Sequence, residues 1–155
     1  MGHRNSEWSR KFYWKQVDEI RSLLEKYVKQ SDQISVDKYL SICEQLGQEP
    51  DPDKMPLEIS DLPSEVQVAF FIYDFLEDVW DGMSGTYLGK MWSNIEYLFK
   101  VYEIEDPKTM LLIMKLWEST VVQHRADKAE QKRKAEERKR KSAGGGKNYT
   151  HNVKG

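Results

Sequence analysis

Apolar residues recur along this 155-residue chain at steps of three and four, the spacing that aligns side chains on one face of an α-helix. The pattern predicts five helices, over residues 7–29, 35–46, 63–80, 86–102 and 107–141. No segment shows the apolar–polar alternation of a half-buried strand, and no Asn-Gly pair marks a tight hairpin. We therefore expect an all-α fold, a bundle of about five helices.

Helix-terminating and capping residues support these boundaries. Ser6 is the predicted N-cap of the first helix, and Gly47 follows the second helix at a position that favours left-handed backbone. Three prolines in residues 48–56 predict an extended loop. Asp106 and Pro107 predict the start of the last helix.

The third predicted helix carries apolar residues on two sides, which is typical of a helix at the centre of a bundle. Its stripes are Val66, Ala69, Phe70, Tyr73, Leu76 and Trp80 on one side, and Val68, Ile72, Phe75 and Val79 on the other. We expect Trp92 and Trp117, on the last two bundle helices, to be buried facing Phe70 and Tyr73.

Charge divides the chain into an acidic body and a basic end. Residues 1–124 hold 13 Lys/Arg and 22 Asp/Glu (13 − 22 = −9), whereas residues 125–155 hold 11 and 4 (11 − 4 = +7), which gives the overall −2. We predict an acidic helical bundle at 1–124, a basic projecting helix at 125–141 and a flexible tail at 142–155. Such asymmetry points to a binding partner.

The basic segment RADKAEQKRKAEERKRK, residues 125–141, has no Gly or Pro and no apolar residue larger than Ala. Three acid–base pairs at i,i+4, namely Glu130–Lys134, Glu136–Arg140 and Glu137–Lys141, favour a helix. This predicts that the last helix continues into solvent beyond residue 122 with nothing to pack against. A stripe of Arg125, Lys128, Lys132 and Lys139 is the predicted partner-binding surface.

Two kinds of partner fit that stripe. Basic side chains on one face can follow nucleic-acid phosphates. However, the four acids of the segment weaken its field, and it holds no aromatic residue to stack on bases. We therefore favour a protein partner, with nucleic acid as the alternative.

One acidic cluster is the strongest candidate for chemistry. If residues 63–80 continue as a helix, then Asp74, Glu77, Asp78 and Asp81 share one face, where carboxylates can hold Mg²⁺. The arrangement is similar to half of the site in all-α nucleotide pyrophosphatases, but a second acidic cluster is not evident. We favour a solvated stripe without metal, and keep a Mg²⁺-dependent hydrolase as a further alternative.

Other reactive residues show no pattern of a catalytic or cofactor site. His3, His124 and His151 lack metal-ligand spacing. The single cysteine, Cys43, lies on an apolar stripe, which favours a core position, and one cysteine cannot form an internal disulfide. No apolar stretch approaches the ~20 residues that cross a bilayer. We expect a non-enzymatic cytoplasmic protein without cofactors and without a membrane partner.

The run EPDPDKMPLEISDLPSEVQVAFFIYDFLEDVWDGMSGTYLGKMW and the closing GGGKNYTHNVKG resemble small proteins of large tailed bacteriophages of the marine T4-like kind. The resemblance is one of general style over about two thirds of the chain, with no diagnostic motif. It implies a helical accessory protein, such as a chaperone or adaptor in tail or virion assembly, within an infected bacterial cell or in the virion. It assigns no site residues.

Overall fold

The computed structural model describes the backbone of residues 4–144 and the side-chain surroundings of residues 15–142. The helices are α1 (Arg4–Ser31), α2 (Val36–Leu46), α3 (Ser64–Asp74), α4 (Ile95–Val101) and α5 (Pro107–Gly144). Two short 3₁₀ turns, Pro52–Lys54 and Ile59–Asp61, lie in the proline-rich connection after α2. The side chain of the predicted cap Ser6 and residues 145–155 of the predicted tail lie outside the described residues. The predicted start of the tail at residue 142 is wrong, because residues 142–144 belong to α5. The mainly helical class is confirmed.

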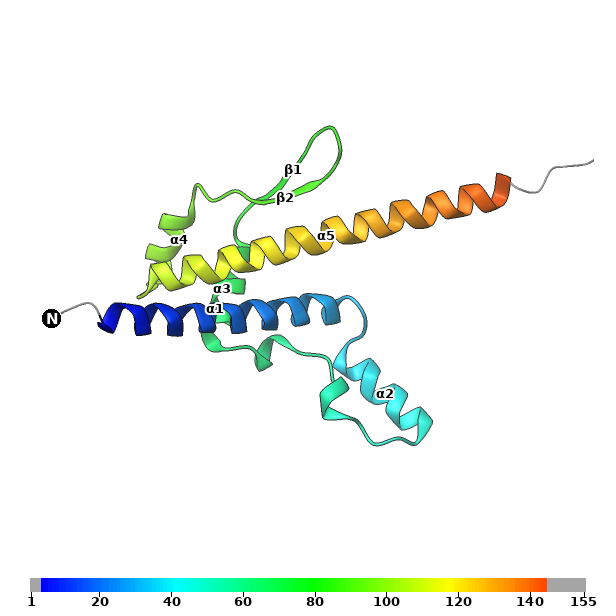
Figure 1. Ribbon diagram of the computed structural model, residues 1–155, viewed down its shortest axis with the longest axis horizontal. Coiled ribbons are helices and arrows are strands. Elements are labelled where there is room, and N and C mark those ends of the chain that lie inside the picture. The colour runs from blue at the N-terminus through cyan, green and yellow to red at the C-terminus, as the bar shows by residue number, and fades with distance from the viewer. Residues whose placement is uncertain (1–3, 145–155) are drawn as a thin grey trace, which may run out of the picture.

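Two long helices form the frame of the molecule. Figure 1 shows α1 and α5 side by side and running in the same direction, with α3 next to them and α2 set apart from this group. The core lies where these helices meet and contains side chains of all three. Its most deeply buried members are Leu24, Val66, Ile72, Ile113 and Met114.

The capping predictions for α2 and α5 are confirmed. Gly47 has a φ of 61°, in the left-handed region, and its N–H donates to the carbonyl of Glu44. The carboxylate of Asp106 accepts the backbone N–H of Thr109 at 3.1 Å, which satisfies a donor that the first turn of α5 cannot pair internally.

The prediction that no strand occurs is wrong. Residues 78–90, expected at the end of one helix and the start of another, form an antiparallel hairpin of β1 (Asp78–Trp80) and β2 (Tyr87–Lys90). The expected helix at 63–80 therefore ends at Asp74, and the expected helix at 86–102 is reduced to α4.

The hairpin turn explains why the helical pattern does not continue. The side chain of Asp81 accepts the backbone N–H groups of Met83 and Ser84 at 2.9 and 2.7 Å, a local arrangement that competes with helix. Gly85 then adopts a φ of 66°, which glycine tolerates best. Asp81-Gly82 was the available sequence signal, because an Asp-Gly pair between apolar runs favours a hairpin.

The predicted tryptophan contacts are present in a different setting. Phe70 stacks on Trp117 with ring centroids 4.2 Å apart, and Tyr73 lies 6.3 Å from Trp92. However, Trp92 lies in the connection between β2 and α4 rather than on a helix, and both tryptophans are only partly buried. The prediction of two fully buried indoles between helices is therefore wrong.

Candidate functional site

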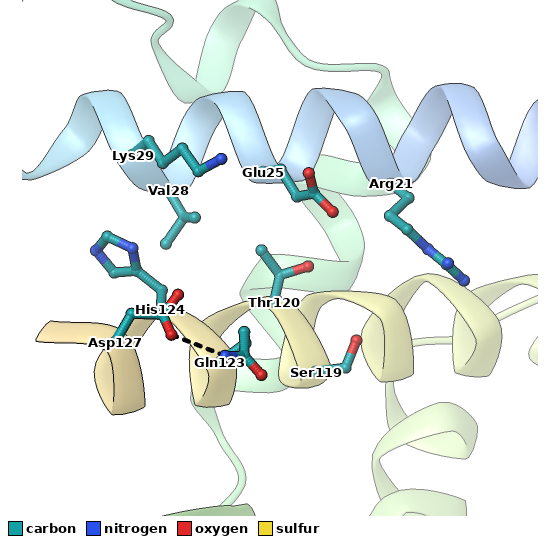
Figure 2. Close-up of a pocket in the computed structure, with 9 residues that line it drawn as sticks. All are labelled: Arg21, Glu25, Val28, Lys29, Ser119, Thr120, Gln123, His124 and Asp127. Carbon is teal, nitrogen blue, oxygen red and sulfur yellow. Dashed lines mark hydrogen bonds between the residues drawn. The ribbon is translucent and has the colours of Figure 1, made fainter. Parts of the chain in front are cut away.

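A polar groove of about 510 Å³ lies between α1 and α5 (Figure 2). Its charges are mixed, because Arg21 and Lys29 bring positive charge while Glu25 and Asp127 bring negative charge. The amide of Gln123 donates to Asp127 at 2.8 Å across one turn of α5. A ligand of one charge would therefore meet repulsion as well as attraction. The lining residues are Arg21, Glu25, Val28, Lys29, Ser119, Thr120, Gln123, His124 and Asp127.

Contacts between charged side chains link the connection after α1 to α5. Asp32 contacts the Nε2 atom of His124 and accepts a hydrogen bond from the Nζ atom of Lys128 at 2.7 Å. Hydrogen bonds from Lys128 and His124, in that order of effect, lower the pKa of the Asp32 carboxyl below its usual value of 3.8. His124, which the sequence presented as isolated, thus has a partner 92 residues away.

The hairpin is attached to α5 through Glu118. One carboxylate oxygen, Oε2, accepts the backbone N–H of Lys90 at 2.7 Å and the indole N–H of Trp92 at 2.9 Å. The other oxygen, Oε1, pairs with Lys115 at 3.0 Å. Gly89 permits this approach, since a Cβ atom at that position would lie 2.7 Å from Oε2. No sequence pattern indicated this contact, because it depends on the hairpin.

A second set of hydrogen-bonded polar side chains connects the hairpin to α3. The hydroxyl of Tyr87 donates to Asp78 at 3.0 Å and lies 3.4 Å from the hydroxyl of Tyr73. Lys90 forms an ion pair with Asp78 at 2.9 Å and donates to the carbonyl of Leu76. Burial and the bond to Tyr87 raise the pKa of Tyr73. Burial opposes the charge on Asp78, but the bonds from Lys90 and Tyr87 outweigh it and lower its pKa. These groups are satisfied within the fold.

The predicted carboxylate face does not form. Asp74 is the last residue of α3, Glu77 follows it, Asp78 belongs to β1 and Asp81 shapes the hairpin turn. The four side chains therefore do not share a helical face, and that expectation is wrong. Within the described residues, no group of three His, Cys, Asp or Glu side chains is placed to hold a metal ion.

Three aromatic rings form an exposed patch, termed the aromatic patch, from Phe71 and Phe75 of α3 and Tyr102 at the end of α4. The rings of Phe71 and Phe75 lie 5.1 Å apart, and Tyr102 lies 5.3 and 5.5 Å from them. Their exposed fractions are 52%, 52% and 39%. Half-exposed Met91 and Phe75 line a hollow of about 50 Å³ at its edge. Of the predicted second apolar side of the third helix, Val68 and Phe75 are exposed, whereas Ile72 is fully buried in the core.

Helix α5 extends beyond the body as far as Gly144. The expected loss of packing beyond residue 122 is wrong for three residues, because His124 and Lys128 contact Asp32 and Arg125 lies 4.0 Å above the ring of Tyr87. Every side chain from 129 to 142 is exposed, and we term this segment the basic arm. Of the predicted stripe, Arg125 and Lys128 therefore contact the body, whereas Lys132 and Lys139 belong to the arm.

Two of the three predicted acid–base pairs are present in the arm. Glu130 binds Lys134 and Glu137 binds Lys141, each at 2.6 Å. No ion pair joins Glu136 to Arg140 among the described side chains, so that prediction is wrong. The five other basic residues form no ion pair with another described residue: Lys132, Arg133, Arg138, Lys139 and Arg140.

Within residues 4–144, no helix has the length and apolar content needed to cross a membrane. The chain matches no protein-family model, and neither the curated proteins nor the solved structures include one significantly similar to it.

Proposed function

We propose that this chain is a non-enzymatic interaction protein that binds other proteins through the basic arm and the aromatic patch. The observation that carries the proposal is the pairing of two unlike exposed surfaces on one small chain. The arm contributes charge at the end of a long helix, and the patch contributes contiguous aromatic area. Exposed apolar clusters of this kind mark interaction sites, and aromatic side chains dominate the energy of many interfaces.

The polar groups of the structure support a binding role over a catalytic one. The hydroxyls of Tyr73 and Tyr87 and the carboxylates of Asp78 and Glu118 attach the hairpin, and the groove between α1 and α5 brings together side chains of opposite charge. Neither arrangement places a nucleophile beside a base that is itself oriented by a third group, as a hydrolytic site requires.

Nucleic-acid binding by the arm is the alternative partner class. Two members of the basic stripe, Arg125 and Lys128, are engaged with the body, which leaves Lys132 and Lys139 for phosphate contacts on that face. Because only two of the four stripe residues remain for phosphate contacts, we favour a protein over a nucleic acid as the partner. The resemblance to small phage proteins extends the proposal to an accessory or assembly role, as chaperone or adaptor, in an infected bacterium.

Photo-crosslinking in the natural host cell tests the proposal. A crosslinking amino acid is placed at position 138 of the arm, at position 71 of the patch, and at exposed position 44 of α2 as the matched control. We expect discrete protein adducts from positions 138 and 71 and none from position 44. Adducts to nucleic acid alone at position 138 would favour the alternative, and equal labelling at all three positions would contradict both.

A further inference from the structure

The chain segment that carries Phe71 and Phe75 is acidic. Residues 64–81, which include α3 and β1, hold Glu65, Asp74, Glu77, Asp78 and Asp81 and no Lys or Arg. Of these, Asp78 is neutralised by Lys90, whereas Asp74 adjoins Phe75 in the chain and Glu77 lines the hollow beside it. Both carboxylates are exposed. The patch therefore combines aromatic faces with negative charge, which suits a ligand rich in arginine or lysine.

The chain itself carries such a ligand. The basic arm holds seven Lys/Arg and three Asp/Glu (7 − 3 = +4), and three of its basic residues are arginines. Arginine guanidinium groups stack on aromatic faces and bind carboxylates with two parallel hydrogen bonds. The basic residues of the arm are thus complementary in charge to the patch, and its arginines suit the aromatic rings.

The fold already uses the same contact within one copy. The guanidinium of Arg125 lies 4.0 Å from the ring centroid of Tyr87 and 5.5 Å from that of Trp80. The ammonium of Lys115 lies 3.8 Å from the centroid of Trp92. Basic residues of α5 resting on aromatic rings of the body are therefore a recurring contact in this protein.

The arm cannot reach the patch of its own chain. Phe70, next to Phe71, stacks on Trp117, whereas Lys132 lies 132 − 117 = 15 residues further along α5, or ~22 Å at 1.5 Å per residue. Figure 1 shows α4 beside the beginning of α5 and the arm at its far end. The continuous helix holds the two surfaces apart, so a contact between them requires two molecules.

We propose that the aromatic patch of one copy binds the basic arm of a second copy of this chain. Arginines of the arm rest on Phe71, Phe75 and Tyr102, and their charges face Asp74 and Glu77. This inference rests on the proposed function, that these surfaces bind protein, and it identifies the partner as the chain itself.

Sedimentation of the full chain at about 0.05 M and about 0.5 M NaCl tests the proposal, since added salt screens exposed charges. We expect self-association at low salt and an association at least about tenfold weaker at high salt. An arm variant, Lys132→Glu with Arg138→Glu, and a patch variant, Phe71→Ser with Phe75→Ser, should each remain monomeric at low salt. A mixture of the two variants should regain a dimer, because each supplies the surface that the other lacks.

Two further variants keep the test independent of folding. Asp74→Asn with Glu77→Gln removes charge at the patch without removing a ring, and should weaken self-association at least about tenfold. Asp37→Asn with Glu44→Gln makes the same charge change on α2, where both residues are exposed, and should leave association unchanged. Melting curves identify any variant that unfolds, and the charge variants then decide the outcome.

Three results would overturn the inference: a wild-type chain that stays monomeric at low salt, a variant mixture that stays monomeric, or equal loss in the α2 control. Retention of duplex DNA by a monomeric wild type, lost in the arm variant, would also overturn it and assign the arm to nucleic acid. If the arm crosslinks to other proteins while the chain itself is monomeric, the proposed function is supported and only the self-association is contradicted.

Discussion

Replacing Glu118 with Ala should loosen the hairpin from α5. The substitution removes the acceptor of the Lys90 backbone N–H, at 2.7 Å, and of the Trp92 indole N–H, at 2.9 Å. Both bonds go to a charged group, and the side chain of Glu118 is only 15% exposed. Hydrogen bonds to charged groups contribute about 1.5–3 kcal/mol each. Because water can enter at the rim and the two losses are not additive, we expect a cost of about 2–4 kcal/mol.

The substitution Glu118→Gln separates the contribution of the negative charge from that of the acceptor oxygen. Glu118→Gln keeps an acceptor oxygen and the side-chain shape but removes the charge, so we expect a cost of about 1 kcal/mol. For a chain of this length 1 kcal/mol corresponds to about 2–4 °C in melting temperature, which places Glu118→Ala at least about 4 °C below the wild type.

Thermal melts and amide hydrogen exchange measure the effect. Exchange of the Lys90 amide should accelerate in Glu118→Ala, since that N–H loses its acceptor. The matched control is Glu96→Ala on α4, an exposed glutamate whose only described partner is Lys100 at 3.0 Å, with an expected cost below about 0.5 kcal/mol. Equal melting temperatures for the two alanine variants, with unchanged Lys90 exchange, would refute the role of Glu118.

Three further predictions concern α5 and its contacts. Truncation after Lys128 should change the melting temperature by no more than about 1 °C, because the described residues beyond it are exposed. Truncation after His124 should lower the free energy of unfolding by about 1 kcal/mol more, because the Arg125 and Lys128 contacts are lost, and thermal melts of both shortened chains measure the difference. Asp32 has a lowered pKa in the folded chain, so its stabilising effect is present above pH ~4 and is lost as the pH falls through the folded value. Because its side chain is 37% exposed, Asp32→Asn should cost at most about 1 kcal/mol at pH 7, and the cost should shrink as the pH falls below ~4, as acid-to-neutral denaturant titrations would show. Gly89→Ala should destabilise the hairpin in melts, since the φ of 112° and the 2.7 Å approach to Glu118 both disfavour a Cβ atom, and a value equal to wild type would contradict that geometry.

The sequence alone was sufficient for features that depend on neighbours in the chain. Apolar spacing identified α1, α2 and α5, because a helix reveals itself in a period of 3.6 residues. Asp106 and Gly47 marked helix ends, because capping is an interaction within a few residues. The continuation of α5 beyond residue 122 followed from helix-forming residues and from pairs one turn apart, two of which are present.

Tertiary contacts determined the conformation of residues 75–94. Its apolar residues fit a helical period, but a strong turn at Asp81 and an acceptor supplied by Glu118, 28 residues after Lys90, favour the hairpin. Local propensity cannot anticipate such an acceptor, since the energy comes from a group that only the fold brings near. Because the hairpin replaces the expected helix, Asp74 does not share a helical face with Asp78 and Asp81. Tertiary structure also placed Phe71 and Phe75 on the surface, because helical spacing reports that a side chain is apolar but not which neighbour covers it.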